Sequence, residues 1–77
     1  MKHIDDYLDK VDKLIGNKIY SLRLDKDMTQ AELTKKLGIS GQQLQKYETA
    51  KNKINASKLA LLAKVMDKDI RYFYEST

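Results

Sequence analysis

The apolar residues in the first third of the chain recur every three or four positions. This spacing places them on one face of an α-helix, which can then cover a hydrophobic core. We therefore expect a helix that ends near residues 24–26, with the acidic residues 1–12 as its frayed start. The apolar residues of this face are Leu8, Val11, Leu14, Ile15, Ile19 and Leu22.

A second helix is predicted after a polar link. Thr29 and Glu32 have the spacing of a capping box, in which both side chains bond free N–H groups at a helix start. The helix should therefore begin at about Gln30. Leu33 and Leu37 give it one apolar side.

A third helix is predicted three residues after the end of the second. Ser40 and Gln43 repeat the capping-box spacing, so this helix should begin at about Gly41. Gly38 stands where the left-handed C-cap of the preceding helix should fall. Only residues 38–40 then separate the two helices. A short connection that contains glycine is typical of the helix-turn-helix.

The helix from Gly41 to Thr49 has two different sides. Leu44, Tyr47 and Glu48 share the side that can face a core. Glutamine can bond adenine bidentately and lysine can donate to guanine in the major groove, so the other side is a candidate DNA-reading surface. An ordinary solvated helix face is the alternative. This polar side consists of Gly41, Gln42, Gln45, Lys46 and Thr49, with Gln43 at its edge.

The last third of the chain predicts two more helices. Asn55 can cap a helix whose apolar positions at 59, 62, 63 and 66 form core scaffold. Asp69 can cap a short last helix that begins at Ile70. Ile70 and Phe73 should pack inward.

The aromatic residues of this last helix are a candidate dimer contact. Tyr72 and Tyr74 should be left at a surface, where amphipathic aromatic side chains often meet a partner chain. We therefore assign Tyr72, Phe73 and Tyr74 to a dimer contact. An intramolecular lid over the chain's own core is the alternative.

The composition indicates an all-α fold. The 77 residues contain no Pro and three Gly, and Leu and Lys, which favour helices, are frequent. The length allows one domain with one small core. We expect a five-helix DNA-binding domain over residues 1–77, with an acidic lead-in at 1–12, the helix-turn-helix at 29–49 and a C-terminal helix at 69–77.

The formal net charge of +4 is unevenly distributed. Residues 1–12 carry two Lys and four Asp, residues 13–27 have a net charge of +2, and residues 59–77 are balanced. Residues 28–58 carry six Lys and two Glu, so the positive excess includes the proposed helix-turn-helix. A DNA-binding surface would need this positive charge to neutralise the phosphates of the DNA backbone. A solvated basic face is the alternative.

Other classes of protein are not indicated. The absence of Cys excludes disulfides and cysteine-based zinc sites, and His3 has no partner at ligand spacing. We find no Gly-rich phosphate loop and no paired acids around a plausible cleft, and we expect no enzyme, metal, cofactor or small-molecule ligand. The longest apolar run is too short for a bilayer, and the start has no signal-peptide pattern, so we expect a cytoplasmic protein.

The segments described above resemble the Cro/cI-type helix-turn-helix of phage repressors, also called the xenobiotic-response-element type. The resemblance covers roughly residues 15–75. In detail the chain is similar to a short alphaproteobacterial subgroup of this family. The segments that carry it are Arg23, TQAEL at 29–33, LGIS at 37–40, QQ at 42–43, QKYE at 45–48, Asn52, Ile54, ASKL at 56–59, the helix to Met66, and YFYE at 72–75.

The resemblance implies specific roles. The family residue that matches Arg23 pairs with the one that matches Glu48, and the one that matches Gln30 anchors a DNA phosphate. For Arg23 the alternative is an ordinary basic surface residue or a phosphate contact.

The chain departs from the family pattern at several positions. Gly41 lacks the side chain that often reads a base, and Thr34 replaces the small residue at the helix crossing. Ala50 and Asp67 stand where the family usually has Gly. The polar link at residues 25–27 also contains no Gly, although the family usually has one there. After the third helix a positive φ is common, so at Ala50 we expect either a rearranged turn or strain.

Together these observations predict a sequence-specific transcription regulator that binds double-stranded DNA as a homodimer and represses from a palindromic operator. The helix at 41–49 should enter the major groove, with Gln42, Lys46, Gln45 and Gly41 at base edges. The alternative is an antitoxin-like subunit or another protein-interaction module with the same fold. The residues assigned to the DNA backbone are Gln30, Ser40, Gln43, Thr49, Lys51, Asn52 and Lys53.

Overall fold

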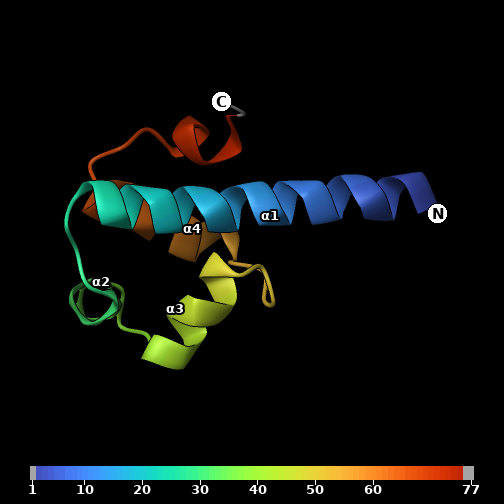
Figure 1. Ribbon diagram of the computed structural model, residues 1–77. Helices are drawn as coiled ribbons and strands as arrows, with labels where there is room; N and C mark the ends of the chain where they lie inside the picture. The colour runs from blue at the N-terminus through green and yellow to red at the C-terminus, as the bar shows by residue number, and fades with distance from the viewer. Residues whose placement is uncertain (1, 76–77) are drawn as a thin grey trace.

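The computed structural model describes residues 2–75, so residue 1 of the predicted lead-in and residues 76–77 of the predicted last helix lie outside it. The all-α prediction is confirmed: the described residues form four α-helices and one short 3-10 helix (Figure 1). The fifth predicted helix is therefore not an α-helix. The elements are α1 (Lys2–Asp25), α2 (Gln30–Leu37), α3 (Gly41–Glu48), α4 (Ala56–Val65) and η1 (Ile70–Tyr74).

The long helix α1 is the axis of the molecule. Its 24 residues span about 36 Å at 1.5 Å per residue, close to the longest molecular dimension of 38 Å. Figure 1 shows η1 on one side of α1 and α3 on the opposite side, while the first turns of α1 project beyond the other helices. The helix α1 packs against α3 and η1, and α2 packs against α3 and α4.

One hydrophobic core joins all five elements. The apolar side predicted for the first helix is only partly correct, because Leu8, in the first turns of α1, is 43% exposed. Val11 is half-buried at the boundary, and every apolar position predicted for α4 is buried. The buried apolar residues are Ile15, Ile19, Leu22, Leu33, Leu37, Leu44, Leu59, Leu62, Ala63, Met66 and Phe73.

Gly16 lets α1 and the end of α3 approach closely. A Cβ atom at this position would lie 2.7 Å from the carbonyl oxygen of Tyr47 and 2.9 Å from that of Glu48. Both distances are shorter than van der Waals contact, and both neighbours are backbone atoms. Only glycine therefore fits without moving one helix away from the other.

Three helices end with a non-glycine residue in the left-handed conformation. Asp27 follows α1, Ala50 follows α3 and Asp67 follows α4, with φ values of 53°, 61° and 54°. After α3, Lys51 N–H donates to the Lys46 carbonyl at 2.8 Å and Ala50 N–H donates to the Tyr47 carbonyl at 3.2 Å, which is the Schellman pattern. The turn is therefore kept, and the strain expected at Ala50 is present in its backbone.

The short helix η1 is anchored by one aromatic side chain. Asp69 caps it as predicted, accepting from Arg71 N–H at 2.9 Å. Phe73 is fully buried in the core, so the prediction that it packs inward is confirmed, and its assignment to the dimer contact is wrong. The prediction that Ile70 packs inward is also wrong, since it is 40% exposed. Residues 70 and 73 share one side of a 3-10 helix, but η1 begins at Ile70, directly after the exposed residues 67–69, and solvent still reaches the side chain there.

The two tyrosines of η1 differ from each other. Tyr72 is half-buried against the core, and its ring is covered by the ammonium groups of Lys18 and Lys68, at 4.7 and 4.8 Å from the ring centre. These contacts place Tyr72 in an intramolecular cluster. Tyr74 is 52% exposed and is the member of the predicted dimer contact with the most free surface.

Candidate nucleic-acid interface

The start of α2 is fixed by a complete capping box. Glu32 N–H donates to Thr29 Oγ1 at 3.1 Å, and Thr29 N–H donates to Glu32 Oε1 at 2.8 Å. The hydrogen bond from the Thr29 backbone N–H, followed by one from the Thr29 hydroxyl, holds the pKa of the Glu32 carboxyl below its ordinary value. As the first residue of α2, Gln30 contributes a backbone N–H that the helix itself leaves free, and such groups bind anions.

The turn between α2 and α3 sets the direction of α3. Gly38 caps α2 with φ 67°, and its N–H donates to the Thr34 carbonyl at 2.8 Å. Ser40 then caps α3 by accepting from Gln43 N–H at 3.0 Å. Among the described hydrogen bonds, the reciprocal bond from Ser40 N–H to Gln43 is not present, so this second capping box is half formed.

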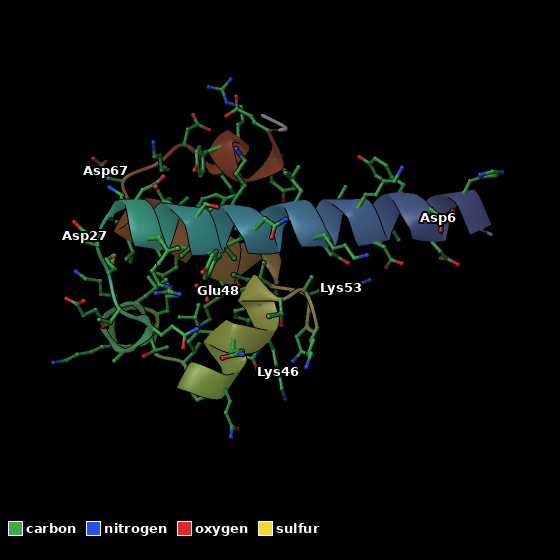
Figure 2. The ribbon with its side chains drawn as sticks, viewed as in Figure 1. Asp6, Asp27, Lys46, Glu48, Lys53 and Asp67 are labelled. Carbon is green, nitrogen blue, oxygen red and sulfur yellow. The ribbon has the colours of Figure 1, made fainter. Side chains whose placement is uncertain are left out.

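The two sides of α3 are as different as the sequence predicts. Leu44 and Glu48 are buried and Tyr47 is half-buried, whereas Gln43 has intermediate exposure. Figure 2 shows Glu48 on the part of α3 nearest α1, and Lys46 extending away from the body of the molecule. The exposed residues of this outer side are Gly41, Gln42, Gln45, Lys46 and Thr49.

A buried charge network holds α3 from behind. Arg23 Nε donates to Glu48 Oε2 at 2.7 Å and Arg23 Nη2 donates to Glu48 Oε1 at 3.2 Å, a bidentate pair. Arg23 Nη1 also donates to the Met28 carbonyl at 3.0 Å. Gln30 Nε2 donates to Glu48 Oε1 at 3.0 Å, so one carboxylate joins the ends of three helices.

The network is electrostatically balanced. Its two charged side chains are 9% and 4% exposed, and they neutralise each other. The hydrogen bond that Arg23 donates to Glu48 raises the pKa of the guanidinium above its ordinary value, so Arg23 keeps its positive charge. Within the described residues, no buried side-chain nitrogen or oxygen lacks a hydrogen-bond partner. This arrangement positions α3 without using the polar side chains of its outer face.

The structure adds residues of α1 that the sequence analysis did not identify. A hollow of about 410 Å³ lies where α1 meets the start of α2 and the end of α3. Asn17 and Tyr20 contribute α1 side chains to its wall, next to Gln30, Gln45 and Thr49. The spacing of 17 and 20 on one helix face was visible in the sequence. What was not visible is that Gly16 brings this face against α3.

The basic segment after α3 extends the outer face. Lys51, Asn52 and Lys53 are exposed, and the backbone N–H groups of the first two both donate to the Lys46 carbonyl. A second hollow, of about 400 Å³, is lined by Gln42, Gln45, Lys46 and Lys51. Lys53 Nζ lies 3.9 Å from Asp12 of α1, a distance typical of a weak surface ion pair.

The residues predicted to contact DNA and those predicted to contact a second copy fall into two separate places. The base-reading and backbone residues lie together on α3, its flanking turns and the start of α2. The aromatic residues of η1 lie on the opposite side of α1 (Figure 1). Among residues 2–75 there is no group of three or more metal-binding side chains, and none of the helices there is long and apolar enough to cross a membrane.

Comparisons with known proteins agree with this geometry. A protein-family model described as Helix-turn-helix matches residues 19–73. An uncharacterized HTH-type transcriptional regulator of Rickettsia conorii is 45% identical over 71 residues, which are 92% of this chain and 57% of that protein. An uncharacterized transcriptional regulator in the ATPase CF(0) region of Rhodospirillum rubrum is 38% identical over 64 residues, 83% of this chain and 59% of that protein. The chain thus spans little more than half the length of these relatives.

Two solved structures share the fold at low sequence identity. The restriction-modification controller protein C.AhdI from Aeromonas hydrophila superposes with a TM-score of 0.75 at 19% identity, covering 80% of this chain and 94% of that one. The clp gene regulator ClgR from C. glutamicum superposes with a TM-score of 0.77 at 21% identity, covering 82% of both chains. The long matched segment and the named relatives carry the assignment: this chain belongs to the helix-turn-helix family of the Cro/cI, or xenobiotic-response-element, type, the family of DNA-binding transcriptional regulators.

Proposed function

We propose that α2 and α3 form the DNA-binding helix-turn-helix of this chain and that α3 enters the major groove. The observation that carries the proposal is the contrast between the two sides of α3. Its inner side is fixed by the buried Arg23–Glu48 pair, whereas its outer side presents exposed amides and a lysine. Gln42, Gln45 and Lys46 then read base edges. At Gly41, where nothing lies within 4 Å of an added Cβ, the backbone itself can approach the DNA.

The DNA backbone is held at both ends of α3 and at the start of α2. Gln30 and Ser40 stand at helix starts, where backbone N–H groups bind phosphate oxygens. After α3, the exposed cations neutralise phosphates and release counterions. Gln43 and Thr49 border the reading face and also contact the DNA backbone. The other residues in the backbone contact are Gln30, Ser40, Lys51, Asn52 and Lys53.

The proposed biological role is a cytoplasmic repressor that binds a palindromic operator as a homodimer. A single short helix reads too few base pairs to select one operator, whereas two copies on half-sites about 34 Å apart double the sequence that is read. Occupying the operator would then exclude other proteins from the promoter.

The alternative is an antitoxin-like or other protein-interaction module. Both functions use the same fold, so the DNA-binding step must be measured directly. The full chain is used to select bound duplexes from random DNA at two salt concentrations. We expect a palindromic motif with half-sites about one turn apart, and an affinity that falls steeply as salt rises. If no motif is enriched and only weak, salt-sensitive binding remains, the regulator proposal fails and the interaction module is favoured.

A further inference from the structure

The projecting turns of α1 expose an apolar surface that the DNA-binding proposal does not use. We call it the arm surface; on the described residues it consists of Ile4, Tyr7, Leu8, Val11 and Tyr74. Ile4, Tyr7, Leu8 and Tyr74 are 52%, 66%, 43% and 52% exposed, and Val11 is half-buried beside them. Apolar side chains clustered in this way mark interaction sites more often than apolar side chains scattered singly.

The arm surface continues the face of α1 that covers the core. Ile4, Leu8 and Val11 stand at helical spacing with Ile15, Ile19 and Leu22, so all lie along one stripe. The second half of the stripe is buried by the domain, whereas the first half extends past it (Figure 1). The same stripe is therefore covered at one end and free at the other.

A hollow beside the stripe can receive another helix. It measures about 340 Å³ and is lined by Tyr7, Lys10, Val11 and Leu14 of α1 and by Tyr74 of η1. Its walls are mostly apolar, and Lys10 supplies a single positive charge. A matching occupant would present apolar side chains together with a carboxylate.

The charges on α1 select among the candidate occupants. Residues 1–12 carry two Lys and four Asp, a net charge of −2, which disfavours DNA and an anionic membrane as occupants. Two arms also repel each other through this net charge, so their contact depends on the apolar stripe and on the pairing of Lys10 with a facing carboxylate. A second arm carries the required apolar stripe and also the acids Asp5, Asp6 and Asp9, which can face Lys10 of the first copy. Figure 2 shows Asp6 on the projecting turns, far from Lys46, so an arm contact leaves the outer face of α3 free.

We propose that the arm surface binds the arm surface of a second copy of this chain. Each arm lies against the hollow of the other in a symmetric contact, which uses the same residues twice. This inference specifies the interface of the dimer in the proposed function and so rests on that function. With Phe73 buried, Tyr74 is the residue of the C-terminal aromatic segment that contributes most to this interface.

The area and the reach of the arm fit this contact. An aromatic side chain covers about 200 Å², so Tyr7 and Tyr74 together expose roughly 240 Å² in each copy, before Ile4, Leu8 and the charged flanks are counted. This is a substantial part of the roughly 800 Å² that each partner buries in an ordinary interface. The arm also reaches beyond the other helices along the direction of α1 (Figure 1), so a second copy can approach it.

The test compares matched substitutions on and off the arm surface in the full chain. Leu8→Glu introduces a charge on the arm surface, and Leu61→Glu introduces the same charge on α4, where the side chain is 37% exposed. In sedimentation we expect Leu8→Glu to weaken dimerisation roughly hundredfold, because a symmetric interface contains the charge twice. Leu61→Glu should leave the dimer intact, and circular dichroism should give both variants the same helix content.

Site-specific crosslinking locates the contact independently. The chain has no Cys, so Leu8→Cys and Leu61→Cys each introduce one thiol. A short bismaleimide should join two copies of Leu8→Cys and leave Leu61→Cys monomeric on a denaturing gel.

The possible outcomes test the arm interface and the DNA-binding proposal independently. Full dimerisation of Leu8→Glu, or crosslinking of Leu61→Cys in place of Leu8→Cys, would overturn the arm interface. A wild type that is monomeric in solution and on its DNA, yet selects a motif, would overturn it while the DNA-reading proposal stands. Crosslinked arms without any enriched motif would support the interface and reject the DNA-binding function.

Discussion

Gln30 at the start of α2 and Glu48 at the end of α3 are joined by a hydrogen bond of 3.0 Å between Gln30 Nε2 and Glu48 Oε1. The same oxygen accepts from Arg23 Nη2 at 3.2 Å. The residue assigned to a DNA phosphate is therefore also part of the network that orients α3. Its backbone N–H and the second hydrogen of Nε2 can still donate to a phosphate oxygen, so both roles can coexist.

The Arg23–Glu48 pair should matter more for stability than any surface charge. Arg23→Met leaves the Glu48 carboxylate buried without its cation and should lower the free energy of unfolding by about 3 kcal/mol. The double variant Arg23→Met/Glu48→Leu removes both charges and should recover much of this loss. Urea denaturation measures the free energy of unfolding of both variants. As a control, Asp12→Asn removes the weak pair with Lys53 and should leave the midpoint nearly unchanged. Equal midpoints for Arg23→Met and wild type would contradict the structural role of the pair.

Lys46 should contribute to sequence preference. Lys46→Ala removes a donor on the outer face of α3 and should relax the preference at one or two base pairs by about 1–3 kcal/mol. Site selection with the variant measures this directly. The control is Lys64→Ala, which removes an exposed lysine on α4, away from the proposed interface. An unaltered motif for Lys46→Ala would remove Lys46 from the reading residues.

Gln30 should affect all DNA sequences equally. Gln30→Ala should weaken binding to every duplex by a similar factor, because a phosphate contact carries no base information. The slope of affinity against salt should stay the same, since the amide is neutral, whereas Lys51→Ala should reduce that slope by about one unit. Binding titrations at several salt concentrations distinguish the two. A loss confined to some sequences would contradict the backbone role of Gln30.

Ala50 should be improved by glycine. Its φ of 61° is strained for a residue with a Cβ atom, so Ala50→Gly should raise the free energy of unfolding by about 0.5–1 kcal/mol. Thermal or urea unfolding measures the change. Asp27→Gly and Asp67→Gly are the comparison, and we expect smaller gains there, because Asp tolerates this conformation better than Ala. A destabilised Ala50→Gly would show that the methyl group makes a contact worth more than the strain.

Acid should weaken the start of α2. The Thr29 backbone N–H holds the pKa of Glu32 below its ordinary value, and the Arg71 guanidinium does the same for Asp69. A carboxyl whose pKa is lower in the folded than in the unfolded chain stabilises the folded state. This stabilisation is fully present above the pKa of the unfolded chain, about 4.3 for Glu, and is lost as pH falls through the pKa of the folded chain. Melting temperatures of wild type and Glu32→Gln should therefore differ most above pH 5 and converge in acid. Parallel curves at all pH values would contradict the contribution of the Glu32 charge.

The sequence alone determined the local structure of this protein. Thr29, Ser40, Asn55 and Asp69 start helices where short-range capping patterns predicted, and Gly38 ends α2 with the expected left-handed geometry. These features depend on hydrogen bonds between residues two to four positions apart, so the local sequence contains all the information they need. The polar and apolar sides of α3 follow from helical periodicity in the same way.

Only the tertiary structure decided which faces meet. Periodicity placed Leu8 on the core face of α1, but Leu8 is exposed. The first turns of α1 project beyond the other helices (Figure 1), which leaves no neighbour to cover them. Tyr72, Phe73 and Tyr74 were all assigned to one dimer contact, yet Phe73 fills the core, Tyr72 lies beneath two lysines and only Tyr74 is largely exposed. The contact of Gly16 with α3, which brings Asn17 and Tyr20 to the start of α2, is also a long-range feature. Such contacts depend on how far each helix extends over its neighbours, and that distance is set by packing of the whole chain.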